Sequence, residues 1–291
     1  EPPLIFASIM TFNGGDTVVS RVLTRTTDYF TIRLEEYPND NGPHYIETIG
    51  WIALKPGIWV IGDKIWEVGT IAAGSTYVTV NLQYRFQNTP VIITYINSYN
   101  EGGPSGRAEA GAHTRQRNPT STSFEVKVEE QTDTPHVPET IGYIAVLGEK
   151  YEFRLWPSPS GFYFVRIYYT SGTTINDLKF EYARVYPYYA YWYIDNYWPP
   201  WDRDRNYWRR YYFHVSFSIT PIVVFKIQTE NEPDNCHERL NNVGLSYFDY
   251  ALQETPAFDG EHTYNEEGGF IAIEPGLIFG YEWVAPEPGY V

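Results

Sequence analysis

Short runs in which apolar and polar residues alternate recur along the chain. Three of them are Phe30–Leu34, Phe124–Val128 and Phe248–Leu252, each with a large apolar residue at every second position. A period of two places one face of a strand against a core and the other toward solvent. Helical periodicity is nearly absent, and 21 Pro and 23 Gly punctuate the runs. This pattern predicts an all-β protein of antiparallel β-sandwiches with almost no helix.

A longer motif occurs three times and marks the ends of three related repeats. His44 begins His-Tyr-Ile-Glu-Thr-Ile-Gly-Trp-Ile-Ala, and His136 begins His-Val-Pro-Glu-Thr-Ile-Gly-Tyr-Ile-Ala. In the third copy His262 precedes Glu-Glu-Gly-Gly-Phe-Ile-Ala, which starts at Glu266. Self-similarity of this kind predicts tandem copies of one supersecondary unit. From this register we expect one phenylalanine and one isoleucine of each copy to point into the core of its own sandwich: Phe30, Phe124 and Phe248, and Ile52, Ile144 and Ile271.

Two upstream landmarks repeat in the same order. A proline precedes a β-branched apolar run in each copy, and an arginine follows the proline after 18, 17 and 18 residues. The prolines are Pro3, Pro90 and Pro221, and the arginines are Arg21, Arg107 and Arg239. These landmarks predict sandwich repeats at residues 1–69, 77–157 and 211–291, with a linker and insertion at 158–210.

The first repeat differs from the others at its start. A β-prone segment precedes the proline in the second and third copies, at Tyr77–Phe86 and Tyr211–Phe217, whereas only Glu1 and Pro2 precede Pro3. We therefore expect the first sandwich to lack its first strand. An open sheet edge is a template for pairing with another segment, so we expect a strand from elsewhere to complete it.

The insertion between the second and third repeats offers a candidate for that strand. From Tyr182 to Phe213, 15 of 32 residues are aromatic. A soluble monomer rarely exposes so large an apolar surface. The insertion could fold onto its own sandwich, form a subunit interface or stack on sugars. The candidate interface or glycan-stacking residues are Tyr188, Tyr189, Tyr191, Trp192, Tyr193, Tyr197, Trp198 and Trp201, and the segment from Tyr186 to Tyr197 is the candidate donor strand.

The repeat resembles the H-type lectin domain. The second copy carries the matching features, which are Phe86–Val91, Arg107, Ser123–Val128 and Tyr143–Ala145. The resemblance implies a six-stranded antiparallel β-sandwich that forms trimers and binds sugars. The His-x-x-Glu-x-x-Gly lead-in and the tandem arrangement depart from the family pattern, so the resemblance assigns no sugar-binding residue.

Composition limits which binding partners and which cellular location are expected. The formal net charge is −15 and the pI is about 4.8, a field that repels nucleic-acid backbones. No apolar run reaches the ~20 residues of a transmembrane helix. The single cysteine, Cys236, excludes an intrachain disulfide. The chain begins Glu1-Pro2-Pro3 rather than with Met, which fits a secreted or cell-surface protein that has lost its signal peptide.

The histidine–glutamate pairs of the repeat motif are candidates for metal binding. They are His44 with Glu47, His136 with Glu139 and His262 with Glu266. A zinc site needs three or four convergent ligands, whereas each pair supplies two. We therefore expect these pairs to form loop hydrogen bonds that position the following strand.

Two further sequence features, adjacent glutamates and a calcium-loop-like segment, give little support for catalysis or calcium binding. Adjacent glutamates occur at Glu35–Glu36 and Glu129–Glu130, with Glu254 near the matching place. Neighbours on a strand point to opposite faces, so they do not form the paired acids of a glycosidase. Asp202–Asn206 begins like a calcium loop, but Tyr207 stands where an EF-hand needs Gly. We expect that the protein is not an enzyme and that it has no catalytic residue, no bound metal and no cofactor.

Repetition without catalytic groups, an unfilled strand position and abundant aromatic residues favour a structural role. The sequence predicts a non-enzymatic subunit of an extracellular filament, fibre or surface appendage, with a viral fibre as one form. We expect it to be a homopolymer held by β-strand complementation and an aromatic interface. The alternative is a carbohydrate-binding adhesin or lectin with glycans as partners, and a glycan-active enzyme is the third hypothesis.

Overall fold

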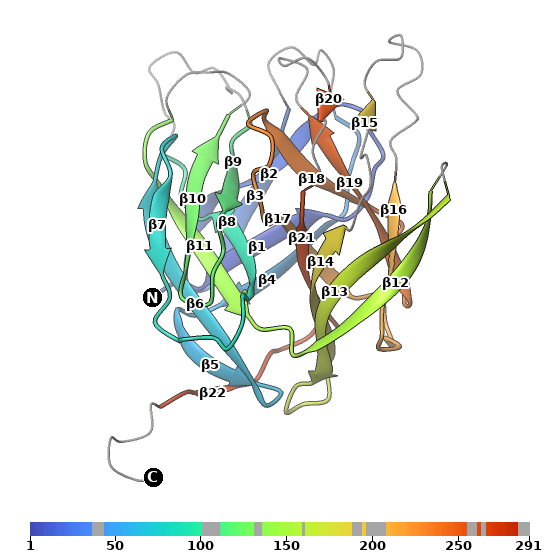
Figure 1. Ribbon diagram of the computed structural model, residues 1–291. Coiled ribbons are helices and arrows are strands. Elements are labelled where there is room, and N and C mark those ends of the chain that lie inside the picture. The colour runs from blue at the N-terminus through green and yellow to red at the C-terminus, as the bar shows by residue number, and fades with distance from the viewer. Residues whose placement is uncertain are drawn as a thin grey trace.

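The structure is a computed structural model of the chain. It describes residues 1–36, 44–100, 111–130, 136–158, 161–187, 194–195, 208–254, 261–262 and 266–284. These residues form strands β1 to β22 and contain no helix (Figure 1). All the strand pairs in this part of the chain are antiparallel, as the hydrogen-bond register of β11 with its neighbours illustrates. The predicted all-β, antiparallel fold class is confirmed.

The strands follow one another in three groups. The first sandwich contains β1 (Leu4–Ile9), β2 (Val18–Arg25), β3 (Phe30–Glu36) and β4 (Ile49–Leu54). The second contains β5 (Gly57–Ile61), β6 (Lys64–Ala73), β7 (Val78–Asn81), β8 (Val91–Ile96), β9 (His113–Arg117), β10 (Ser123–Glu129) and β11 (Glu139–Val146). The third contains β12 (Lys150–Ser158), β13 (Gly161–Thr173), β14 (Lys179–Pro187), β15 (Ile194–Asp195), β16 (Arg209–Tyr212), β17 (Ile222–Ile227), β18 (Cys236–Asn241), β19 (Tyr247–Glu254), β20 (Glu261–His262) and β21 (Gly268–Ile273). The last strand, β22 (Tyr281–Glu282), lies beyond the third sandwich in sequence.

The second and third sandwiches share one topology. In the second, the sheet β5-β6-β11-β8 faces the sheet β7-β10-β9. In the third, β12-β13-β14-β21-β17 faces β16-β19-β18. The strand that enters each sandwich, β6 or β14, pairs with the strand that ends it, β11 or β21. The three-stranded sheet then begins with β7 or β16.

The first sandwich has only half of this framework. Its two sheets are the pairs β1-β4 and β2-β3. Within the described residues no strand stands where β6 and β14 stand, beside β4, or where β7 and β16 stand, beside β3. Among the strands that the structure describes, two positions of the first sandwich are thus unfilled, one more than the sequence pattern predicts.

The strand pairing also relocates the hairpin β5-β6. This hairpin lies mostly within residues 1–69, yet β6 pairs with β11 of the second sandwich through eight residue pairs. Similarly, β13 and β14 lie in the segment 158–210 and extend the sheet of the third sandwich. The chain therefore passes a hairpin from the end of one repeat into the sheet of the next.

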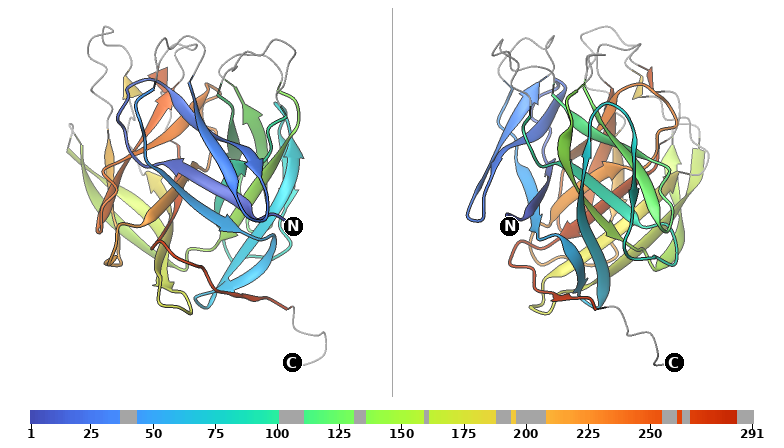
Figure 2. Two further views of the ribbon diagram at one scale, coloured as in Figure 1. Left: turned by 180° about the vertical axis from the view of Figure 1, so that it is seen from behind. Right: turned by 90° about the vertical axis from the view of Figure 1, so that its left-hand side faces the viewer.

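The three repeats surround one common core. Its buried residues come from the inner sheets of all three repeats, and they are Leu4, Phe6, Ile52, Leu54, Ile61, Trp66, Val68, Val91, Ile93, Ile144, Val146, Phe180, Tyr182, Val224, Ile271 and Ile273. Seen from behind, the first repeat lies between the other two (Figure 2). Ile52, Ile144 and Ile271 thus pack between repeats, and our expectation that they fill their own sandwiches is wrong.

Candidate assembly site

Buried ion pairs join the three repeats in a cycle. Arg21 of the first repeat donates to Glu139 of the second at 2.8 Å, and Arg115 of the second donates to Glu266 of the third at 2.7 Å. Arg239 of the third lies 3.6 Å from a carboxylate oxygen of Glu47, in the first repeat. All three guanidinium groups are fully or almost fully buried. A heterologous contact that repeats three times and closes has the geometry of a cyclic trimer, here within one chain.

Each glutamate of this cycle is held by a loop with the pattern Thr/Ser-x-Asn. Glu139 accepts hydrogen bonds from the Ser98 hydroxyl and from the Asn100 backbone N–H. Burial alone would raise the pKa of the Glu139 carboxyl, but its hydrogen bonds, led by that from His136, together with the charge of Arg21, lower it. The carboxylate stays ionised and keeps the neighbouring repeat's arginine in place.

A second contact joins the repeats through side-chain amides. Asn97 accepts from the backbone N–H of Ile5 at 2.8 Å and donates to its carbonyl at 2.9 Å. Gln228 forms the same pair of bonds with Ile92, at 2.9 and 2.7 Å. Each amide satisfies both polar groups of a buried backbone position, which would be costly to leave unpaired.

The glycine of the repeat motif makes room for these amides. A Cβ atom at Gly142 would lie 2.7 Å from the Asn97 amide nitrogen, and one at Gly269 would lie 2.7 Å from the Gln228 amide. In the first repeat the matching glycine is Gly50, and Met10 occupies the place of the amide. Methionine has no hydrogen-bond donor, so the third contact of the cycle differs from the other two.

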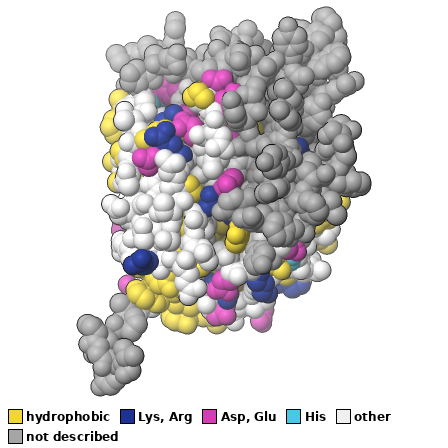
Figure 3. All heavy atoms as spheres, in the orientation of Figure 1, with side chains coloured by type: hydrophobic (Ala, Val, Ile, Leu, Met, Phe, Trp, Pro, Cys, Tyr) yellow, Lys and Arg dark blue, Asp and Glu magenta, His cyan; other side chains and the backbone are white. Residues whose placement is uncertain are grey.

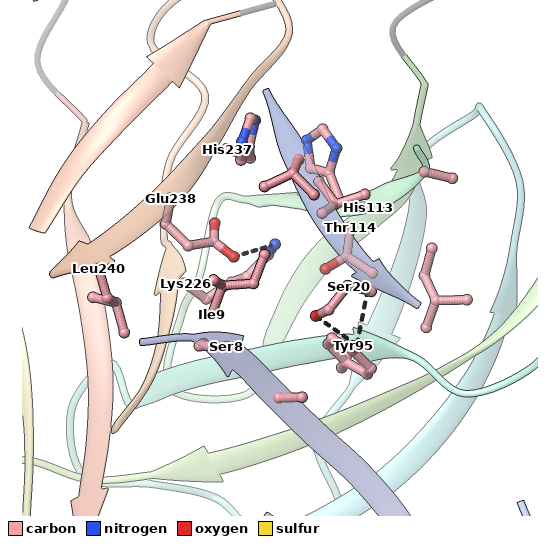
Figure 4. A pocket seen from close by; sticks show the side chains of 15 residues that line it. Ser8, Ile9, Ser20, Tyr95, His113, Thr114, Lys226, His237, Glu238 and Leu240 are labelled. Carbon is pink, nitrogen blue, oxygen red and sulfur yellow. Dashed lines mark hydrogen bonds and ion pairs between the residues drawn. The ribbon is translucent and has the colours of Figure 1, made fainter. Parts of the chain in front are cut away.

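Near the middle of the cycle lies a cavity of about 40 Å³ with both polar and apolar lining residues. Ser8, Tyr95 and Lys226 occupy matching positions around it, each opposite the repeat glycine on the neighbouring strand. Lys226 donates to Glu238 at 2.9 Å, and the Tyr95 hydroxyl contacts Ser20 of the first repeat at 2.8 Å (Figure 4). The cavity is large enough for a few buried waters.

Two histidines stand at matching positions beside the cavity, where the first repeat has Val19. The rings of His113 and His237 lie 5.7 Å apart between their centroids (Figure 4). Burial lowers the pKa of His113 and lowers that of His237 well below its ordinary value. Both rings are therefore neutral near pH 7. In the described part of the chain, no group of three or more His, Cys, Asp or Glu side chains has an arrangement that could hold a metal ion.

The histidines of the repeat motif form hydrogen bonds within their own repeats. The His44 ring lies between Glu36 and Glu47, at 2.9 and 3.1 Å. His136 lies between Glu130 and Glu139 in the same way. These histidines orient the glutamates that receive the neighbouring arginines. The backbone of His262 pairs with Ile194, and its side chain lies outside the described residues.

The face between the two sheets of the first sandwich is half open. Trp51 is 46% exposed, whereas Tyr143, at the matching position in the second repeat, is 4% exposed. Trp51 contacts Phe30 edge-on, with ring centroids 5.1 Å apart. Phe124 and Phe248 are buried in their sandwiches as predicted, but Phe30 is only partly buried. The reason is that no described strand of the first sandwich takes the places that β6 and β7 take in the second.

The aromatic candidates of the insertion lie outside the described residues: Tyr188, Tyr189, Tyr191, Trp192, Tyr193, Tyr197, Trp198 and Trp201. Of the candidate donor strand, the backbone of Tyr186 and Pro187 pairs with β13, and that of Ile194 and Asp195 pairs with β20. These described parts all pair within the third repeat. The predicted roles of the aromatic residues stay predictions.

Sequence reasoning selected Arg107, which lies outside the described residues, and missed Arg115, which donates to Glu266. The loop before β9 is longer in the second repeat, so spacing from the proline selects the wrong arginine. A constant spacing of nine residues separates each true arginine from the first phenylalanine of the next strand: Arg21 from Phe30, Arg115 from Phe124 and Arg239 from Phe248. The Thr/Ser-x-Asn pattern, eight residues after each proline at Thr11, Ser98 and Thr229, was a second available signal.

Comparison with known proteins gives one informative similarity. Over 222 residues, 74% of this chain, the sequence is 27% identical to halomucin from Haloquadratum walsbyi (strain DSM 16790 / HBSQ001). The matched region is 2% of halomucin's length. No family model matches the chain, and no solved structure matches it. The resemblance to the H-type lectin domain therefore rests on the motifs quoted above and stays a prediction. The described residues contain no helix that could cross a membrane.

Proposed function

We propose that the chain is a non-enzymatic structural subunit of an extracellular assembly, joined to its neighbours by strands added to the first sandwich. The half-open face of that sandwich carries the proposal. It combines edges of β4 and β3 that no described strand pairs with and the aromatic pair Phe30 and Trp51. Strand addition supplies backbone hydrogen bonds at the edge and side chains for the open core.

The other two sandwiches serve as internal references for the completed state. In both of them the matching edge is filled, and the matching aromatic residue is buried. The similarity to halomucin supports an extracellular role, since mucins are extracellular proteins. The long buried contacts between repeats support a rigid subunit that could bear load in a filament.

The alternative is a carbohydrate-binding adhesin. It draws support from the exposed ring of Trp51 and from the aromatic residues of the insertion, because aromatic faces stack on the apolar faces of sugars. On this hypothesis the chain would stay monomeric and bind glycans. A glycan array probed with the monomer and with any assembled form distinguishes the two functions.

Sedimentation velocity and electron microscopy over a range of protein concentrations test the proposed assembly. The variant Trp51→Lys places a charge on the open face and should abolish assembly. Tyr212→Lys is the matched control, because Tyr212 is 50% exposed on the third sandwich, where the sheet edges in question are filled. A protein that stays monomeric up to millimolar concentration, or equal effects of the two variants, would contradict the proposal.

A further inference from the structure

The strands that complete the second and third sandwiches share a sequence pattern. In β6 the run Trp66–Gly69 reads Trp-Glu-Val-Gly, and in β14 the run Phe180–Ala183 reads Phe-Glu-Tyr-Ala. Each run, here called the glutamate pattern, has an aromatic residue, a glutamate, an apolar or aromatic residue, and then glycine or alanine. The pattern occurs nowhere else in the sequence. It therefore marks the strand that stands beside the last strand of a repeat.

The small residue of the glutamate pattern lies opposite the aromatic residue of the repeat motif. Gly69 pairs with Tyr143, and Ala183 pairs with Phe270. A Cβ atom at Gly69 would collide with the Tyr143 ring, so a larger side chain does not fit there. The matching residue of β4 is Trp51, whose ring is larger still. A strand added beside β4 therefore needs glycine or alanine at this place.

The glutamate of the pattern holds a turn that belongs to the same structural unit. Glu67 is buried and accepts the backbone N–H groups of Gln83 and Tyr84 at 2.9 and 2.8 Å. Glu181 is also buried and accepts two N–H groups of the matching turn at 2.7 and 3.1 Å. In both sandwiches this turn follows the first strand of the three-stranded sheet, β7 or β16. The two strands, the glutamate and the turn thus form one unit.

The first sandwich is open on the face that such a unit covers in the other two. Along β4 the residues that face the shared core, Ile52 and Leu54, are buried, whereas Ile49, Trp51 and Ala53 on the other face are not. All the matching residues of β11 are buried. Over β7 and β10 of the second sandwich, polar and charged side chains face the solvent (Figure 3). The open face of the first sandwich is therefore an inner face that lacks its cover among the described strands.

We propose that the first sandwich binds a two-stranded unit of another polypeptide whose inner strand carries the glutamate pattern. The inference rests on the proposed function and names the chemistry of the partner strand. Both strands of this chain that carry the pattern are already paired, β6 with β11 and β14 with β21. In the register of the filled sandwiches, the partner's glutamate lies opposite Ala53 and its small residue lies opposite Trp51. The second strand of the partner pairs with β3 and covers Phe30.

A copy of the chain's own unit serves as the probe. Residues 64–90 are duplicated ahead of Leu4 in place of Glu1–Pro3, so that the copied proline directly precedes β1 as the native one precedes β8. This fusion should fill the first sandwich and abolish assembly. Amide hydrogen exchange in β4 should slow by about tenfold or more. Phe30→Ala should then destabilise the fusion as much as Phe124→Ala does.

Substitutions confined to the copied unit test the pattern and leave the native second sandwich unaltered. Gly69→Leu in the copy places a large side chain opposite Trp51, and Glu67→Lys removes the acceptor for the turn. Each should leave β4 exchanging as fast as in the chain without the fusion. Thr79→Leu is the matched control, because Thr79 is exposed on β7, and it should keep the protection. Fast exchange in β4 of the unaltered fusion, or equal protection in all three variants, would overturn the proposal.

The fusion also separates this inference from the proposed function. If the wild-type chain assembles but the fused unit leaves β4 unprotected, the partner pattern is wrong and the proposed function stands. If the fused unit protects β4 and the fusion still assembles like the wild type, assembly does not use the first sandwich. That result would overturn the proposed function while supporting the partner pattern.

Discussion

The first and second sandwiches contain the same strand positions in β1 to β4 and β8 to β11, yet only the second has a closed core. Six matching positions face the space between the sheets in each. In the second sandwich Phe124, Val126, Val128, Ile141, Tyr143 and Ala145 are all buried. In the first, Phe30, Ile32, Leu34, Ile49, Trp51 and Ala53 are all partly or largely exposed. Similar apolar residues therefore have different environments, which depend on strands supplied from elsewhere in the chain.

This difference separates two sources of stability. The second sandwich is stabilised by its own core and by the core shared between repeats. The first sandwich has mainly the shared core, to which Leu4, Phe6 and Ile52 belong. The first sandwich should therefore hold its shape through its neighbours, while its outer face remains available for binding.

The largest difference in stability is expected for alanine substitution at the matching phenylalanines, Phe124 and Phe30. Phe124→Ala should lower the free energy of unfolding by about 3–5 kcal/mol, the usual cost of removing a buried aromatic ring. Phe30→Ala should cost roughly 1 kcal/mol in the monomer, because much of its surface already contacts water. Urea unfolding measures both variants. Equal losses would mean that the first sandwich has a closed core in solution.

A fall in pH from 7.5 to 5.5 should destabilise the chain through two buried histidines, one in the second repeat and one in the third. His113 and His237 have lowered pKa values in the folded state, whereas the unfolded chain binds protons at the ordinary value near 6.5. Their stabilising contribution is present above pH 6.5 and is lost as the pH falls toward the folded pKa values. The slope should reach about 1.4 kcal/mol per pH unit for each histidine.

Unfolding midpoints at pH 7.5 and 5.5 measure this effect. The variant His113→Val carries the residue that the first repeat has at this position and should flatten the pH profile. A profile that does not change in the variant would contradict the role of His113.

Removing the amide contact between the first and second repeats should have an intermediate effect on the free energy of unfolding. Asn97→Leu should cost about 2 kcal/mol, because the N–H and the carbonyl of Ile5 lose their partners in a buried place. Hydrogen exchange at the Ile5 amide should accelerate in the variant. The control Asn81→Leu changes an asparagine at an exposed position of β7 and should change stability little. Unchanged exchange at Ile5 would show that another group holds this strand.

The smallest expected effect is a gain in stability. Met10 occupies the position of Asn97 and Gln228 but cannot form their hydrogen bonds. Met10→Gln should add the third amide contact and stabilise the chain by about 1 kcal/mol. Thermal unfolding measures the gain, with Met10→Leu as the isosteric control. A loss of stability in the glutamine variant would mean that the third contact has a different geometry.

Local pattern was sufficient to predict the all-β, antiparallel fold class. Alternation in Phe124–Val128 and Phe248–Leu252 reports a strand with one buried face wherever it lies. The glycines at positions 50, 142 and 269 are recognisable in the sequence as part of a motif, but the reason why glycine is needed there is not. It depends on an amide from a neighbouring strand, and no single run of sequence contains both partners.

Long-range pairing explains the rest of what could not be predicted. Trp66 lies within the predicted first repeat, 1–69, yet its strand belongs to the sheet of the second. Arg115 looks like an ordinary strand residue until Glu266 is placed beside it. The position beside β4 that no described strand fills became visible only in the order of the strands in each sheet.

The residues around the central cavity illustrate what a single chain permits and a homotrimer does not. On a true threefold axis every side chain meets two copies of itself, so a lysine would face two further lysines. Here Ser8, Tyr95 and Lys226 share that position, and the single cation pairs with Glu238. Fusion of the three repeats removes the requirement for identity, so each copy is free to diverge. The second and third repeats form complete sandwiches, while the first presents an open one.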